Sequence, residues 1–218
     1  SKPFRFKARA WELQQHTTIA PHDCVGSNLF AHTRRGQVMR VVPRENEDIN
    51  EVWLSDRDRF GYEGLYSEDR LQTPLVRIDG EWQAVDWETG LQAAVDGLRG
   101  VVDAHGADQV GVLVSPSATL EHMSLLQGLA RGNGVNNIDH RQRQVDYSEQ
   151  DKEPLCPSLG QTVAALESVN GALLIGANPR KEQPIIGQRL RKAAIAGAHL
   201  MVVNPVDYEF MFDLNASS

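Results

Sequence analysis

The cysteines and histidines are the side chains of this sequence best suited to nucleophilic or metal chemistry. Cys24 and Cys156 lie far apart, without the spacing of a zinc knuckle, a CxxC redox pair or a disulfide framework. Cys24 has no identifiable base partner, and no serine lies in a G-x-S-x-G elbow. The residues therefore give no support for a thiol enzyme or a hydrolase, and the cysteine usage favours a reducing compartment.

One run places three metal-capable groups in a row: His22, Asp23 and Cys24. Adjacent residues point in different directions and so rarely share a metal, and the histidines form no HExxH or similar ligand pair. A metal at this run is therefore the weaker hypothesis.

Three loops carry hydrogen-bonding groups beside a proline: 115–119, 177–181 and 204–205. Each follows an expected parallel strand, and ligands of open parallel sheets bind beyond the carboxyl ends of the strands. Such loops could hold a nucleotide or a pterin, but the same residue types also cap helices and end strands. No GxGxxG or GxxxxGK[ST] motif is present, so the usual nicotinamide and ATP sites are not indicated.

The elements that must position these residues change character near residue 80. Before it, alternation and turn residues predict a small antiparallel module with strands at 4–8, 25–30 and 37–42 and a hairpin at 77–83. After it, apolar periodicity predicts alternating helices and buried strands. The helices are expected at 86–104, 119–130, 162–167 and 186–196, and the strands at 109–114, 171–176 and 199–203.

Strand, helix and strand joined by short loops are typical of a parallel crossover. The fold class is therefore α/β, with a β-rich module at residues 1–80 and a parallel-sheet domain at 81–218. The strand at 109–114 is expected to be buried on both faces, and 136–160 is expected to be a long connection.

Composition excludes some functions. The 218 residues contain 22 Lys and Arg against 29 Asp and Glu, a net charge of −7, so a phosphate-contacting nucleic-acid binder is not indicated. No apolar stretch approaches the roughly 20 residues of a membrane span. The first residues, Ser-Lys-Pro-Phe, lack an initiator Met, and the chain is expected to be an excised piece.

Five segments of the first module resemble the G subunit of NADH-quinone oxidoreductase (respiratory complex I) in order and spacing. They are Gly26–Leu29, Val38–Arg44, Asn46–Glu51, Trp53–Asp56 and Arg59–Tyr62. The rest of the chain is similar to the molybdopterin-oxidoreductase-like (formate dehydrogenase-like) domain of the same family. The segments that carry this similarity are Gly111–Pro116, Asn136–His140 and Leu174–Pro179, followed by Glu182 and Pro184.

Cluster-bearing members of this family hold a [4Fe-4S] cluster on four cysteines, because thiolates bind the iron of such clusters. The matching positions here are Ala20, Asp23, Ser27 and Ser55, none of which is cysteine, and Cys24 is one residue out of register. The resemblance therefore implies a module that has lost its cluster, with no metal ligand and no cofactor in this piece. Iron–sulfur clusters are expected only in the missing N-terminal part of the full polypeptide.

The pterin-type loops are expected to be vestigial and to bind no cofactor. The residues concerned are Ser115, Gly176, Asn178, Pro179 and Glu182. No catalytic residue is expected in this piece, and the α/β domain is expected to be truncated, since a two-pterin molybdenum site needs further domains.

The resemblance implies a structural and interaction domain within an oxidoreductase complex that supports electron transfer from NADH to quinone, with no redox centre of its own. Its expected partners are other peripheral-arm subunits, with no nucleic acid and no membrane insertion. The expected location is the cytoplasmic side of the inner membrane, or the matrix side in a eukaryote. The alternative is a molybdopterin-dependent oxidoreductase of formate dehydrogenase type that binds a guanine-dinucleotide pterin.

Overall fold

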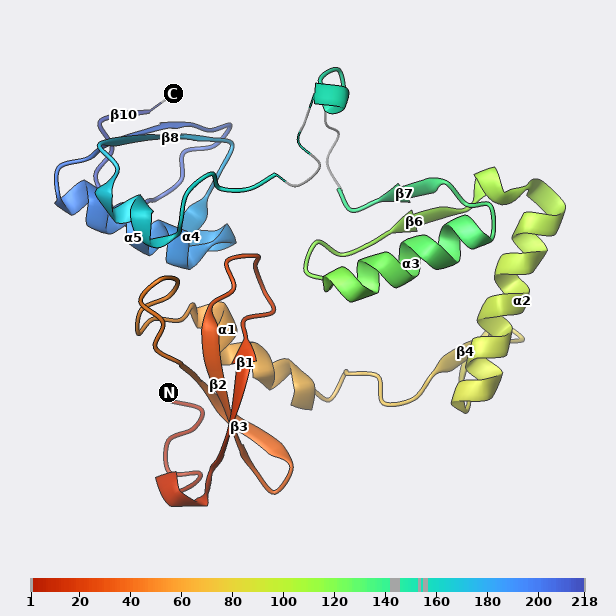
Figure 1. Ribbon diagram of the computed structural model, residues 1–218. Coiled ribbons are helices and arrows are strands. Elements are labelled where there is room, and N and C mark those ends of the chain that lie inside the picture. The colour runs from red at the N-terminus through yellow and green to blue at the C-terminus, as the bar shows by residue number, and fades with distance from the viewer. Residues whose placement is uncertain (1, 142–145, 153, 155–156, 218) are drawn as a thin grey trace. The chain divides into compact units, whose positions relative to one another are not determined.

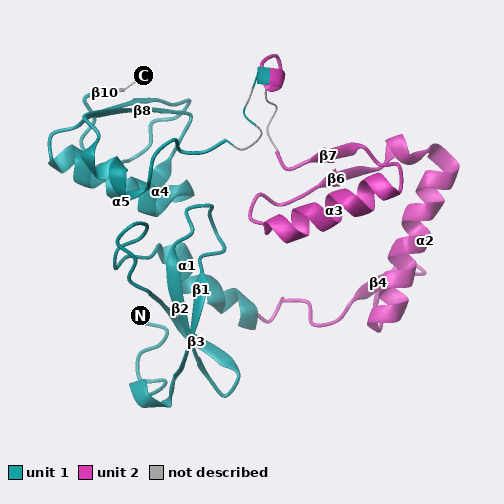
Figure 2. Cartoon of the chain, viewed as in Figure 1, with its two compact units in different colours: residues 1–66, 152–218 teal, residues 67–151 magenta. Residues whose placement is uncertain are grey.

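The computed structural model describes residues 2–141, 146–152, 154 and 157–217 (Figure 1). Two compact units divide the chain: unit 1 contains residues 1–66 and 152–218, and unit 2 contains residues 67–151 (Figure 2). Unit 1 thus joins the two ends of the chain. The sequence-based division into domains at 1–80 and 81–218 follows the order of the chain, whereas these units follow spatial contacts. The domain division therefore stays a prediction. Cys156 lies outside the described residues.

The N-terminal half of unit 1 is a three-stranded antiparallel sheet in the order β1-β2-β3. The strands are β1 Gln14–Ile19, β2 Asn28–Arg34 and β3 Gln37–Pro43. Arg35 and Gly36, both at positive φ, form the tight turn between β2 and β3. The expected strand at 4–8 is wrong, because those residues form turns. The sequence did not predict β1, because all six of its residues are exposed and the segment has no alternation of apolar and polar side chains.

Asn50 holds the loop after β3 against β2. This side chain is 1% exposed, and its Nδ2 donates to the carbonyls of Arg44 at 3.1 Å and Trp53 at 3.0 Å. Its Oδ1 accepts from the Asn28 amide at 2.9 Å. Buried backbone groups of a loop need such partners, so Asn50 fixes the path of the loop toward the small core of Ala20, Leu29 and Leu54.

The C-terminal half of unit 1 is a parallel three-stranded sheet in the order β10-β9-β8. The strands are β8 Gly171–Ile175, β9 His199–Val203 and β10 Ala216–Ser217. The helices are α4 Pro179–Glu182 and α5 Pro184–Ile195. The predicted strand, helix and parallel strand at 171–203 are therefore confirmed.

Arg189 on α5 ties the two halves of unit 1 together. Its guanidinium is 4% exposed and donates from Nη2 to the carbonyls of Glu47 at 2.6 Å and Ile49 at 2.9 Å, while Nη1 pairs with Glu167. Lys192, one turn further along α5, bonds Glu167 at 2.9 Å. A buried guanidinium is stable only when its donors are satisfied, so α5 and the loop after β3 are held in one arrangement.

Unit 2 begins with a hairpin and continues as a second strand–helix–strand segment. Asp79 and Gly80, both at positive φ, make the predicted hairpin turn, and Asp86 caps the next helix by accepting from the Thr89 amide at 2.8 Å. The hairpin strands are β4 Leu75–Ile78 and β5 Glu81–Ala84. The helices are α2 Trp87–His105 and α3 Leu120–Gly132, and the parallel pair is β6 Gly111–Leu113 with β7 Asn137–Asp139.

The remaining elements are short. They are α1 Asp56–Phe60 and the 3-10 helices η1 Ala10–Glu12, η2 Gly61–Tyr66, η3 Ala107–Gln109, η4 Gln150–Lys152 and η5 Ala164–Ser168. The expected helix at 162–167 is thus a 3-10 turn, and the expected connection at 136–160 contains β7. No helix of the described chain is both long and apolar enough to cross a membrane.

The fold class, an antiparallel β module with parallel α/β segments, is confirmed. The expectation of a strand buried on both faces at 109–114 is wrong, since Leu113 is 60% exposed. Its short valine-rich run indicated a strand but gave no information on what covers each face.

Candidate functional site

The four positions at which the sequence placed lost cluster ligands lie in one region of unit 1. Ser55 begins it as the N-cap of α1: its Oγ accepts from the Asp58 amide at 3.0 Å and donates to the Asp58 carboxylate at 2.7 Å. Serine is favoured at this position because its hydroxyl satisfies an amide that has no partner inside the helix. Ser55 is 5% exposed, so its hydroxyl is committed to the cap.

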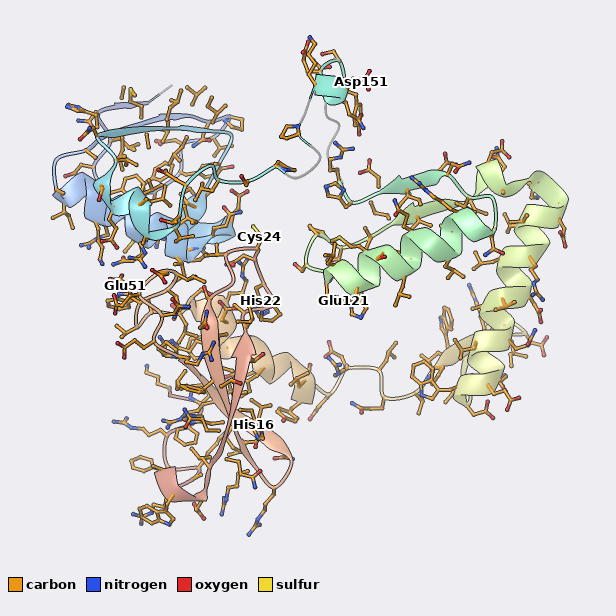
Figure 3. The ribbon with its side chains drawn as sticks, in the orientation of Figure 1. His16, His22, Cys24, Glu51, Glu121 and Asp151 are labelled. Atoms are coloured by element: carbon orange, nitrogen blue, oxygen red, sulfur yellow. The ribbon has the colours of Figure 1, made fainter. Side chains whose placement is uncertain are left out.

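Asp58 connects α1 to the loop between β1 and β2. Its carboxylate is 1% exposed, and its Oδ1 lies 2.7 Å from Nδ1 of His22, labelled in Figure 3. The two carboxylate oxygens are therefore shared between Ser55 and His22, which satisfies a buried carboxylate. Gly61 packs against the ring: a Cβ there would stand 2.6 Å from Cε1 of His22. The His22 side chain is thus held on two sides.

Ala20 and Ser27 face each other across the same loop, with the Ala20 amide donating to the Ser27 carbonyl at 2.9 Å. Ser27 is fully buried, and its Oγ has no partner among the described residues. Asp23 accepts from the Val25 amide at 3.0 Å and lies 3.5 Å from Arg57. Ala20 and Ser27 are therefore in direct contact. Asp23 and Ser55 lie in the same region, because Asp23 pairs with Arg57 of α1 and Ser55 is the N-cap of that helix.

The His22, Asp23 and Cys24 run is not a shared ligand set. His22 contacts Asp58, Asp23 contacts Arg57, and Cys24 is exposed. Figure 3 labels His22 and Cys24. Sequence reasoning missed Asp58 and Gly61. A serine followed by an acidic residue three positions later is a capping signature, and it could have identified Asp58.

The predicted pterin-type loop of unit 1 follows β8. Gly176, at φ +61°, donates to the Val203 carbonyl at 2.9 Å, and the Asn178 amide donates to Glu182 Oε2 at 2.9 Å. Pro179 is buried at the start of α4. The Oδ1 atoms of Asn178 and Asn204 are buried without a partner among the described residues.

Ser115 lies in unit 2, where its Oγ accepts from the Ser117 amide at 3.2 Å. This bond is a local turn contact. The Ser115 hydroxyl therefore has a partner in the backbone of its own turn.

Two families of known proteins match this chain. The family described as molybdopterin oxidoreductase matches residues 70–214. The family described as NADH-ubiquinone oxidoreductase NDSU1/NuoG-like, 4Fe-4S domain, matches residues 13–63.

Curated relatives are similar along most of the chain. The G subunit of the NADH-quinone oxidoreductase of Rickettsia bellii is 36% identical over 198 residues, which cover 91% of this chain and 28% of that protein. The mitochondrial NADH dehydrogenase [ubiquinone] iron-sulfur protein 1 of Solanum tuberosum is 36% identical over 204 residues, which cover 90% of this chain and 26% of that protein. The chain thus spans little more than a quarter of the length of these relatives.

The fold is also found among solved structures. Acetylene hydratase from Pelobacter acetylenicus matches with a TM-score of 0.54 and 13% identity, covering 87% of this chain and 27% of that chain. At this identity the likeness concerns the fold alone.

The expectation that this piece carries no cofactor is wrong. The family matched at residues 13–63 is a 4Fe-4S domain, so an iron–sulfur cluster is indicated within this chain and not only in a preceding part. The expectation rested on the absence of cysteine at 20, 23, 27 and 55, whereas the family match covers the whole segment 13–63.

The side chains at those positions do not fit such a cluster by themselves. Thiolates hold the iron of [4Fe-4S] clusters, whereas a methyl group, a carboxylate and two hydroxyls stand at 20, 23, 27 and 55. Across the described part of the chain, no group of three or more His, Cys, Asp or Glu side chains is placed to hold a metal. No electron-transfer step is therefore assigned to these residues.

Proposed function

We infer the function of this chain from its family: it belongs to the molybdopterin oxidoreductase family, and its curated relatives are named as the G subunit of NADH-quinone oxidoreductase. The resemblance drawn from the sequence is thereby confirmed. We propose that the chain is part of the iron–sulfur G subunit of an NADH:quinone oxidoreductase. Its role there is structural: it packs against other subunits and supports electron transfer from NADH to quinone.

One observation carries this proposal. The similarity to the G subunit covers 91% of the chain, and so includes the β module as well as the more widely shared α/β part. The packing of unit 1 supports it, because Arg189 and Asn50 fix the segment 44–53, where part of the resemblance lies. A domain built around such fixed loops offers a rigid surface to neighbours.

The proposed partners are the other peripheral-arm subunits of the complex. The proposed location is peripheral, on the cytoplasmic side of the inner membrane, or on the matrix side in a eukaryote. The net charge of −7 favours protein neighbours over nucleic acid, because phosphate contacts need a basic face.

A gene deletion tests this role. Membranes from the deletion strain should lose NADH-dependent quinone reduction, and the full-length gene should restore it. Succinate-dependent quinone reduction in the same membranes is the control and should not change. Unaltered NADH-dependent reduction in the deletion strain would contradict the proposal.

The alternative is a molybdopterin-dependent oxidoreductase of formate dehydrogenase type. The Oδ1 atoms of Asn178 and Asn204, which have no partner within the described chain, favour it, since they offer acceptors at the ends of β8 and β9, where ligands of parallel sheets bind. If a pterin were bound, these amides would help to hold it, and the molybdenum or tungsten that it carries would supply the redox chemistry. Metal analysis of the full-length protein separates the two functions: molybdenum or tungsten favours the alternative, and iron alone favours the complex I role.

A further inference from the structure

A cleft of about 620 Å³ lies in unit 1 between α1 and the segment that contains α4 and the start of α5. Cationic and large apolar side chains dominate its walls. They include Arg57, Arg59, Arg180, Lys181, Trp53 and Met211. The four cationic side chains contrast with the net charge of −7 of the whole chain.

Arg57 builds one wall of the cleft. Its Nη1 donates to the Lys181 carbonyl at 3.2 Å and its Nη2 donates to the Glu182 carbonyl at 3.0 Å. These bonds join α1 to α4 and fix the spacing of the cationic side chains. The lining residues all belong to unit 1, which is teal in Figure 2, so the cleft lies within one compact unit.

The remaining cations are available to a bound anion. Lys181 makes no side-chain hydrogen bond or ion pair with the described residues, and Arg59 meets only the largely exposed Asp56, at 3.4 Å. Arg180 pairs at 2.8 Å with Glu209, whose side chain is 86% exposed. Exposed pairs of this kind contribute little to stability, so an incoming carboxylate can replace them.

The apolar side chains indicate the class of the occupant. Trp53 is 51% exposed and Met211 is 58% exposed. Trp, Met and Arg are enriched in protein–protein interfaces, and complementary charge sets the register of the partner. A small ligand is held by a pocket that covers most of its surface. Trp53 and Met211 remain more than half exposed at the wall of this cleft, so their apolar area is better matched by a larger partner such as a polypeptide.

We propose that this cleft docks an acidic segment of a partner polypeptide. Carboxylates of that segment pair with Lys181 and Arg59, and an apolar side chain of the segment covers Trp53. The proposal deepens the proposed function by giving the chemistry of one partner, and it rests on that function only for the presence of partner subunits.

Site-specific cross-linking in the assembled complex tests the proposal. Gln188 lines the cleft, and its side chain makes no hydrogen bond with the described residues, so it is replaced by benzoylphenylalanine in the full-length protein, and the complex is purified and irradiated. The cross-linked peptide should come from another polypeptide of the complex, and from a segment of it with net negative charge. The double variant R59E/K181E should lower the cross-link yield at least tenfold, whereas R35E/R99E, with the same charge change outside the cleft, should leave it unaltered.

Three results would overturn the proposal: a cross-link to a neutral or basic segment, no cross-link to any polypeptide, or full yield in R59E/K181E. Suppression of the cross-link by added guanosine diphosphate would assign the cleft to a nucleotide instead. NADH:quinone activity is measured in the same sample. A complex that is active but fails to cross-link refutes the docking proposal alone, and an inactive preparation refutes the proposed function.

Discussion

His22 Nδ1 lies 2.7 Å from Oδ1 of Asp58, a carboxylate that is 1% exposed and whose other oxygen accepts from Ser55. One buried side chain thereby connects the loop between β1 and β2 with the first turn of α1. The stability of the candidate site depends on this connection.

Asp58→Ala should destabilise the chain by about 2–4 kcal/mol, because it leaves the Ser55 hydroxyl and the His22 ring without their buried partner. Urea unfolding measures the change. Asp56→Ala is the control, since that side chain is 87% exposed on the same helix and its removal should cost less than about 1 kcal/mol. Equal losses in both variants would show that the His22–Asp58 contact contributes nothing.

Ser27→Ala should be neutral or stabilising by about 1 kcal/mol, because it removes a fully buried hydroxyl that has no partner among the described residues. Ser55→Ala, at an equally buried position, should cost about 1–2 kcal/mol because it removes the N-cap of α1. Thermal unfolding of the two variants gives the comparison. A large loss in Ser27→Ala would reveal a ligand or partner on that hydroxyl.

Gly61→Ala should displace the His22 ring from Asp58, since the new Cβ would stand 2.6 Å from the ring. The expected loss is about 1–2 kcal/mol, with a shift of the His22 ring resonances in an NMR spectrum. Gly64→Ala is the matched control, because nothing among the described residues lies within 4 Å of a Cβ at that position. If the His22 resonances keep their positions in Gly61→Ala, the described packing is wrong.

Glu167 of η5 pairs with Arg189 and Lys192 of α5, and we expect this contact to weaken in acid. Burial raises the pKa of Glu167, but its hydrogen bonds with Lys192 and Arg189 outweigh burial and hold the pKa below 4.5. The contact therefore stabilises unit 1 fully above pH 4.5 and loses its contribution as the pH falls through the lowered folded pKa.

The pH dependence of the urea midpoint measures this effect. In Glu167→Gln the urea midpoint should fall less steeply below pH 4.5 than in the parent chain. In Glu68→Gln, at an exposed position, the midpoint should fall as it does in the parent chain. If the urea midpoint of Glu167→Gln falls below pH 4.5 as steeply as that of the parent chain, the acid sensitivity does not come from Glu167.

Much of the fold follows from local patterns. The turn at Asp79 and Gly80, the cap at Asp86 and the apolar period of α2 are encoded within a few residues, and the structure has each of them. β1 was missed because all its side chains are exposed, and its identity as a strand depends on pairing with β2.

The site was harder to predict than the elements. The four positions 20, 23, 27 and 55 could be located by resemblance, but the contact between His22 and Asp58 spans 36 positions in the chain. The links from Arg189 to Glu47 and Ile49 span 142 and 140 positions. No local pattern encodes contacts over such separations, and only the folded chain reveals them.

Membership of an NADH:quinone oxidoreductase is tested by purifying the tagged full-length protein from gently solubilised membranes and assaying NADH oxidation with a quinone analogue. We expect NADH:quinone activity to co-purify with the tagged protein, together with iron and other subunits. A protein that purifies alone, without NADH oxidation and with molybdenum or tungsten, would contradict it.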